Sequence, residues 1–152
     1  MGQITPPPSG RVYFDANVLI YFVEEHEPYF TASLPLWDAF RAGQIGLETS
    51  ELTLLEVLVK PAREGNDELG ASYRTLFTDT GGIIVHPVTR AVLERAAERA
   101  ALVRADHRLR TPDAIHAATA IRVGSPLFLT NDSGFRKVSG LNVAILDEIV
   151  AA

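Results

Sequence analysis

The stretch Arg11-Val-Tyr-Phe-Asp15-Ala-Asn-Val-Leu-Ile-Tyr-Phe-Val23 indicates the fold class of this chain. Its first four residues favour a short β-strand, and the apolar residues after Asp15 favour a helix. Short apolar strands continue to alternate with helices along the rest of the sequence. Because that alternation is typical of a parallel sheet covered by helices on both faces, the sequence predicts an α/β fold.

The remaining elements follow from periodicity and from helix-start and helix-stop residues. Further strands are expected at 45–49, 83–85, 127–129 and 143–146, and further helices at 31–41, 50–61, 66–78, 88–103, 111–122 and 147–152. Pro61 is expected to stop the helix that Ser50 caps, and Thr111 is expected to cap a helix that has Pro112 at its first position. The small apolar stripe of residues 88–103 suits close packing on a sheet.

Length and composition bound the organisation of the chain. At 152 residues it is expected to form one domain over residues 11–152, preceded by a flexible tail at residues 1–10 with three consecutive prolines. No apolar run approaches the ~20 residues that span a bilayer, so no membrane partner is expected. The absence of cysteine excludes disulfides and thiolate metal sites, and a reducing cytoplasm is the simplest compartment.

The net charge of −5 argues against a protein that coats nucleic acid non-specifically. It does not argue against a nuclease, because acids gathered at a metal site count as negative charges until the metal binds. Gly-rich phosphate-binding loops are absent, so a nucleoside triphosphatase is not expected.

Four acidic residues stand at the edges of different apolar segments, each at a strand exit or in an early helical turn. They are Asp15, Glu56, Asp113 and Asp132. In open α/β sheets such positions converge at the carboxyl ends of the strands. Carboxylates gathered there repel one another unless a cation joins them, and oxygen-only ligands suit Mg²⁺ or Mn²⁺. The pattern predicts a metal-dependent enzyme that acts on a phosphodiester.

Each acid also has a purely structural interpretation. Asp15 suits a helix N-cap, Asp113 a favourable interaction with a helix dipole, and Asp132 a turn. Glu56 adjoins the apolar side of its helix, where a carboxylate needs a partner. His116, one turn after Asp113, fits packing or hydrogen bonding better than metal ligation.

Four stretches in order carry a family resemblance. They are Val12-Tyr-Phe-Asp-Ala-Asn17, Thr49-Ser-Glu-Leu-Thr-Leu-Leu-Glu56, Leu109-Arg-Thr-Pro-Asp-Ala-Ile-His-Ala117 and Phe128-Leu-Thr-Asn-Asp-Ser-Gly-Phe135. Together they resemble the PIN-domain ribonucleases, and most of all the VapC-type toxins of bacterial toxin–antitoxin pairs. The resemblance extends over residues 11–149.

The resemblance implies a three-layer α/β/α sandwich around a mostly parallel, four- to five-stranded sheet, and an endoribonuclease that depends on Mg²⁺ or Mn²⁺. It assigns the catalytic and metal-binding acids to Asp15, Glu56, Asp113 and Asp132, and the small polar residues that orient them to Asn17 and Thr130. It also implies a homodimer and an antitoxin partner whose tail enters the active-site groove. RNA maturation or decay is an alternative role within the same family.

Two further sets of residues are candidates for binding. Arg104, Arg108 and Arg110 precede Asp113 and suit contact with the RNA backbone, although cations at the end of a helix also interact favourably with its dipole. Trp37, in an aromatic stretch at helical spacing, is the candidate anchor for a partner.

Three rival interpretations remain at this stage. A haloacid-dehalogenase-like phosphatase needs a second acid where Asn17 stands, and a receiver domain needs a late lysine after a strand, whereas Lys137 follows the turn at Asp132. A non-catalytic RNA- or protein-binding module on the same fold is distinguished by metal-dependent cleavage, which the module lacks.

Overall fold

The computed structural model describes residues 1–103 and 109–152 and contains a five-stranded sheet. The strands are β1 (Arg11–Phe14), β2 (Gly46–Ser50), β3 (Ile84–His86), β4 (Leu127–Thr130) and β5 (Val143–Ile145). They lie in the order β3-β2-β1-β4-β5 and every neighbouring pair is parallel. Because the chain returns to the same edge before each strand, all five strands end at one edge of the sheet.

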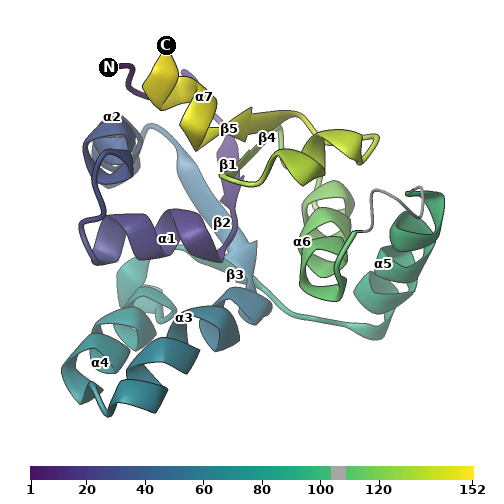
Figure 1. Cartoon of the computed structure of the whole chain (residues 1–152), viewed down its shortest axis with the longest axis horizontal. Coiled ribbons are helices and arrows are strands. Elements are labelled where there is room, and N and C mark those ends of the chain that lie inside the picture. The colour runs from purple at the N-terminus through teal and green to yellow at the C-terminus, as the bar shows by residue number, and fades with distance from the viewer. Residues whose placement is uncertain (104–108) are drawn as a thin grey trace.

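Helices connect the strands and cover both faces of the sheet (Figure 1). They are α1 (Ala16–Val23), α2 (Tyr29–Arg41), α3 (Glu51–Glu64), α4 (Asp67–Leu76), α5 (Arg90–Leu102), α6 (Thr111–Arg122) and α7 (Leu146–Ala151), with short 3₁₀ helices at Asp79–Gly81 and Ser133–Lys137. None of the helices in the described ranges is long and apolar enough to cross a membrane. The predicted α/β/α sandwich is confirmed.

The larger apolar core lies between the sheet and helices α1 to α4. Alternate strand residues such as Val12, Phe14 and Leu47 point into it, as the period of two in a strand requires. Leu19 of α1 and Leu36 of α2 pack against them. This core fixes α1, and with it the residues that follow β1.

A smaller core lies on the opposite face, where Tyr13 and Phe128 pack against Ala117 and Ala120 of α6. The sequence suggested that the small residues of α5 pack on the sheet, but the structure differs. Instead Val92 and other residues of α5 pack against Ala114, Ile115 and Ala118 of α6. Figure 1 shows α5 as the outer helix on this side. Small side chains on both helices allow that close approach.

Two expected helix ends differ in the structure. Pro61 lies inside α3, which ends only at Gly65, where a left-handed backbone (φ 64°) suits glycine. Thr111 is the first residue of α6 rather than its cap, since Arg110 takes the capping position without a side-chain hydrogen bond. Neither difference moves an acidic residue away from the edge of the sheet.

The segment expected to be a flexible tail instead packs against the domain. Ile4 is only 5% exposed and belongs to the larger core. Its backbone N–H donates to the carbonyl of Ala32 at 2.9 Å, and that of Gly2 donates to Val150 at 3.3 Å. The apolar side chain of Ile4 is the signal in the sequence, since the prolines around it do not prevent an extended segment from packing.

Candidate active site

Asp15 and Thr130 stand at the carboxyl ends of the neighbouring strands β1 and β4. Because those strands are parallel and in register, their exits bring the two side chains together. The Thr130 hydroxyl donates a hydrogen bond to Asp15 Oδ2 at 2.5 Å. Asp15 takes the N-cap position of α1 without a side-chain capping hydrogen bond of normal geometry, although the backbone N–H of Val18 lies near enough to lower its pKa.

The Asp15 carboxylate is buried and only partly satisfied. Its exposure is 8%, and among the described residues its Oδ1 atom has no hydrogen-bond partner. Burial raises the pKa of Asp15 to about 6, against the opposing effects of the Thr130 hydrogen bond and the nearby His116 ring. A buried carboxylate oxygen without a donor costs free energy unless a cation or water reaches it.

Glu56 of α3 is held in place by a chain of two hydrogen bonds, the first part-buried and the second buried. His116 Nε2 lies 2.6 Å from Glu56 Oε1, and His116 Nδ1 lies 2.8 Å from the hydroxyl of Tyr13. Burial, together with the nearby Asp15 carboxylate, raises the pKa of Tyr13 well above its ordinary value, so its hydroxyl stays protonated. Since an ionised Glu56 can only accept, His116 Nε2 carries a proton and donates it to Glu56, and in the neutral ring Nδ1 then accepts from the Tyr13 hydroxyl.

Arg110 lies between the other two acids. Its Nε atom is 3.2 Å from Asp113 Oδ2, and one of its terminal nitrogens is 3.8 Å from Asp132 Oδ2. Burial raises the pKa of Asp113 and the Asp132 charge adds to this effect, while Arg110 acts in the opposite direction. Asp132 Oδ1 also accepts a hydrogen bond from the Gly134 N–H at 2.8 Å, so the predicted turn is present too.

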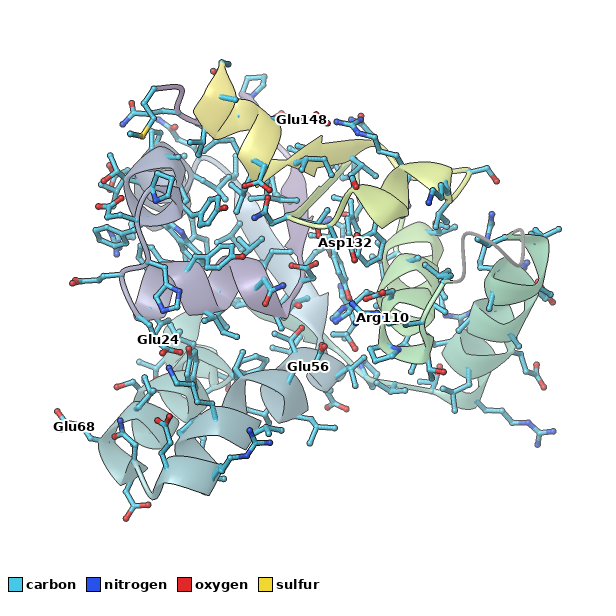
Figure 2. All side chains as sticks on the ribbon, in the orientation of Figure 1. Glu24, Glu56, Glu68, Arg110, Asp132 and Glu148 are labelled. Atoms are coloured by element: carbon cyan, nitrogen blue, oxygen red, sulfur yellow. The ribbon has the colours of Figure 1, made fainter. Side chains whose placement is uncertain are left out.

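All four acids line a single pocket of about 80 Å³ at the carboxyl edge of the sheet. The lining residues are Asp15, Ala16, Asn17, Glu56, Arg110, Asp113, His116 and Asp132. Figure 2 shows the side chains of Glu56, Arg110 and Asp132 in the space between the first turns of α1, α3 and α6. Elements far apart in sequence therefore place their carboxylates around one volume.

The donor set suits a hard divalent cation. Four carboxylates face one guanidinium, and the unpartnered Oδ1 of Asp15 is among them. In the part of the chain that the structure describes, however, no three acidic or histidine side chains lie close enough together to hold one ion as they stand. Hydrogen bonds from Thr130, His116 and Arg110 direct individual carboxylates instead. The four carboxylates therefore line one pocket, but they do not converge on a single position in it.

The remaining predicted residues have different positions. Trp37 is 2% exposed and stacks on Phe22 with ring centroids 4.0 Å apart, so its predicted role as a surface anchor is wrong. Arg104 and Arg108 lie outside the described residues, whereas Arg110 borders the acidic pocket. Tyr13 was not among the predicted site residues. The available signal was strand alternation, which places Tyr13 on the face opposite to Val12 and Phe14, against α6.

A second buried carboxylate lies elsewhere in the sheet. Glu48 of β2 is fully buried, and its Oε1 atom lies 3.2 Å from a guanidinium nitrogen of Arg11 and 2.8 Å from His86 Nε2. Arg11 also donates to the carbonyl of Val123 at 2.9 Å. These contacts tie β1, β2 and β3 to the end of α6, and Glu48 does not line the acidic pocket.

The protein is therefore an α/β domain with a parallel sheet. Its acid-lined pocket lies at the carboxyl edge of that sheet, between strand exits. Within that class the chain belongs to the PIN domain family, whose profile matches residues 12–141. A search of curated protein sequences found no significant match.

Solved structures share this fold at low sequence identity. VapBC2 from Rickettsia felis, bound to a promoter DNA fragment, superposes with a TM-score of 0.70 at 14% identity, covering 89% of this chain and 98% of that one. DNA-bound VapBC from Salmonella typhimurium gives 0.69 at 17% identity, with coverages of 90% and 98%. VapC20 from Mycobacterium tuberculosis, described as a Sarcin-Ricin loop cleaving toxin, gives 0.66 at 20% identity, with coverages of 82% and 92%. The PIN resemblance seen in the sequence is thereby confirmed.

Proposed function

We propose that this protein is an endoribonuclease that depends on Mg²⁺ or Mn²⁺ and acts as the toxin of a toxin–antitoxin pair. The observation that carries the proposal is the convergence of Asp15, Glu56, Asp113 and Asp132 on one pocket in a PIN domain. An uncompensated carboxylate oxygen on Asp15 supports a cation in that pocket. The toxin role is supported by the similarity in fold to VapBC complexes.

The four carboxylates have distinct roles in this proposal. Asp15, Asp113 and Asp132 hold the cation, and Glu56 completes its shell or orients the attacking water. A cation held by these residues would polarise the scissile phosphate and lower the pKa of a water molecule. Thr130 fixes the direction of the Asp15 carboxylate through its 2.5 Å hydrogen bond, and Asn17 lines the same pocket.

Glu56 is positioned to accept a proton from water. His116 donates to Oε1 of this pocket-lining residue, and no described residue forms a hydrogen bond with the other carboxylate oxygen. In-line attack of the water oxygen on phosphorus breaks the P–O3′ bond, and the departing oxygen takes a proton from solvent. Arg110 is the arginine that lines the pocket among the described residues, and its guanidinium offsets negative charge on the phosphate.

The proposed partners are RNA, a second copy of the chain and a cognate antitoxin. The chain is similar in fold to a toxin–antitoxin complex from Klebsiella pneumoniae, which supports an antitoxin for this chain. Leu55 and Val59, one turn apart on α3, are 63% and 45% exposed, which supports a contact with another chain. An RNA-processing nuclease and a non-catalytic binding module are the alternatives.

Cleavage of RNA by the purified protein tests the proposal. We expect cleavage with Mg²⁺ or Mn²⁺, none with a chelator, and loss of at least about 100-fold in rate for Asp15→Asn, since a charged ligand is removed. Asp38→Asn, an exposed acid on α2, is the matched control and keeps full rate. RNA binding without cleavage under all these conditions contradicts the enzyme and supports the module.

Expression in cells separates a toxin from a housekeeping nuclease. We expect growth arrest from the wild-type chain, none from Asp15→Asn, and rescue by the product of a small adjacent gene. Cleavage in vitro without growth arrest supports the RNA-processing alternative.

A further inference from the structure

A groove between α5 and α6 is lined by three arginines. Its residues are Arg95, Arg99, Ala118, Ile121 and Arg122, and its volume is about 350 Å³. That volume falls within the range of roughly 300–1,000 Å³ found for small-molecule sites. The described residues contribute no acidic side chain to its lining. The groove therefore has the opposite charge to the acidic pocket, in a chain whose net charge is −5.

The described part of the chain gives the three guanidinium groups few partners. Arg99 donates to the carbonyl of Ser139 at 3.0 Å, which fixes its direction, and no carboxylate within residues 1–103 and 109–152 pairs with it. Arg95 is 3.4 Å from Glu98, an exposed pair of the kind that contributes little. Within residues 1–103 and 109–152, Arg122 forms no ion pair. Donors that face a concave surface without a carboxylate suit an anionic ligand.

Helix α6 connects this groove to the acidic pocket. Asp113 and His116 in its first half line the pocket, and Ala118, Ile121 and Arg122 in its second half line the groove. At ~1.5 Å per residue, Asp113 and Arg122 are roughly 14 Å apart along the helix axis. At ~100° per residue the two positions lie on opposite sides of α6, so a strand that reaches both has to pass around the helix as well as along it.

We propose that the α5–α6 groove binds the phosphodiester backbone of an RNA strand outside the cleavage pocket. Guanidinium groups bind phosphate through paired N–H donors, and Ala118 and Ile121 offer an apolar surface to a ribose or base. A chain with net charge −5 repels RNA at long range, so a local cationic groove is needed to hold the strand. This inference rests on the proposed ribonuclease function, because RNA is its ligand.

The test measures RNA binding in the Asp15→Asn background, where the strand stays intact. Fluorescence anisotropy of a labelled single-stranded RNA gives Kd for the parent and for an added Arg99→Gln/Arg122→Gln pair. Arg63→Gln/Arg90→Gln is the control, since it removes the same charge from exposed positions that do not line the groove. Thermal unfolding confirms that each variant is folded. If the double variant unfolds because Arg99 no longer contacts Ser139, the single variant Arg122→Gln takes its place in the binding measurement.

We expect the groove pair to raise Kd on the order of tenfold more than the control. We also expect it to lower the slope of log Kd against log salt by about 1.4, because each of the two lost phosphate contacts contributes ~0.7 on a single strand. Equal effects of the two pairs overturn the groove as an RNA site. A parent that binds no RNA overturns it as well. Full competition by a nucleoside monophosphate that depends on Arg99 and Arg122 also overturns it, and indicates a nucleotide site instead.

Cleavage by the otherwise wild-type enzyme separates this inference from the proposed function. With a long RNA we expect the groove pair to raise KM several-fold and to leave kcat unchanged. With an oligonucleotide too short to reach the groove, we expect no change. Absence of metal-dependent cleavage by the wild type contradicts the ribonuclease, whereas cleavage with unchanged KM in the groove pair contradicts the groove alone.

Discussion

The Thr130 hydroxyl links two of the four acids, because it donates to Asp15 Oδ2 at 2.5 Å and accepts from the backbone N–H of Asp132 at 3.1 Å. Thr130 and Asp15 are 115 positions apart in sequence. The last residue of β4 therefore sets both the direction of one carboxylate and the start of the turn that carries another.

Thr130→Val removes that hydroxyl and keeps the β-branched shape. We expect the cleavage rate to fall roughly 10- to 100-fold, as for other groups that orient metal ligands. We also expect a loss of about 1 kcal/mol in the free energy of unfolding, since a buried hydrogen bond is lost. Thr130→Ser retains the hydroxyl and serves as the control. Equal rates for the Val and Ser variants count against an orienting role.

Asp15 gives the folded state a distinctive dependence on pH. Its folded-state pKa of about 6 lies above the ordinary 3.8, so the folded chain keeps a proton that the unfolded chain loses. The stabilisation is complete below pH 3.8 and is lost as the pH rises through about 6. It amounts to at most about 3 kcal/mol, at ~1.36 kcal/mol per pKa unit.

Urea unfolding of the wild type and Asp15→Asn from pH 4 to 7, in metal-free buffer, measures this effect. We expect the wild type to lose stability relative to the variant as the pH rises, since other groups titrate equally in both. A difference that is flat across this range rules out the buried, perturbed carboxylate.

Tyr13→Phe removes the donor that fixes the His116 ring. We expect kcat to fall about tenfold, because the ring no longer holds Glu56 in one direction. KM should change little, since none of these contacts reaches the substrate. Tyr29→Phe is the matched control, as it removes a hydroxyl bonded to a different carboxylate, Asp147, at 2.5 Å. Identical kinetics for the two variants contradict the positioning of Glu56 by Tyr13 and His116.

Arg110→Gln removes the cation that lies between Asp113 and Asp132. We expect tighter binding of Mg²⁺, by several-fold, because the ion no longer competes with a guanidinium for the same oxygens. The measurement is the rise in Tm with Mg²⁺ concentration, which follows the affinity of the folded state. Arg41→Gln, which breaks the exposed pair with Asp38 at 3.4 Å, is the control and leaves the titration unchanged. Weaker Mg²⁺ binding in Arg110→Gln disproves competition.

Helix and strand positions were largely predictable because their signals are local. The expected bounds lie within a few residues of those observed, and the exceptions have physical reasons. Pro61 was expected to end α3, but Gly65 supplies the left-handed turn that ends it. Trp37 was expected to anchor a partner, but an aromatic residue at helical spacing does not reveal which side of its helix faces the core, and here it stacks on Phe22.

The sequence by itself determined the α/β alternation, and with it the placement of the four acids at strand exits and early helical turns. Both follow from side-chain periodicity and from the parallel direction of the strands. Only the tertiary structure decided what each acid contacts: Thr130 for Asp15, His116 for Glu56, and Arg110 for Asp113 and Asp132. The same holds for the arginine-lined groove between α5 and α6. Hydrogen bonds and pockets depend on separations of a few ångströms between residues far apart in sequence, and the packing of the folded chain sets those separations.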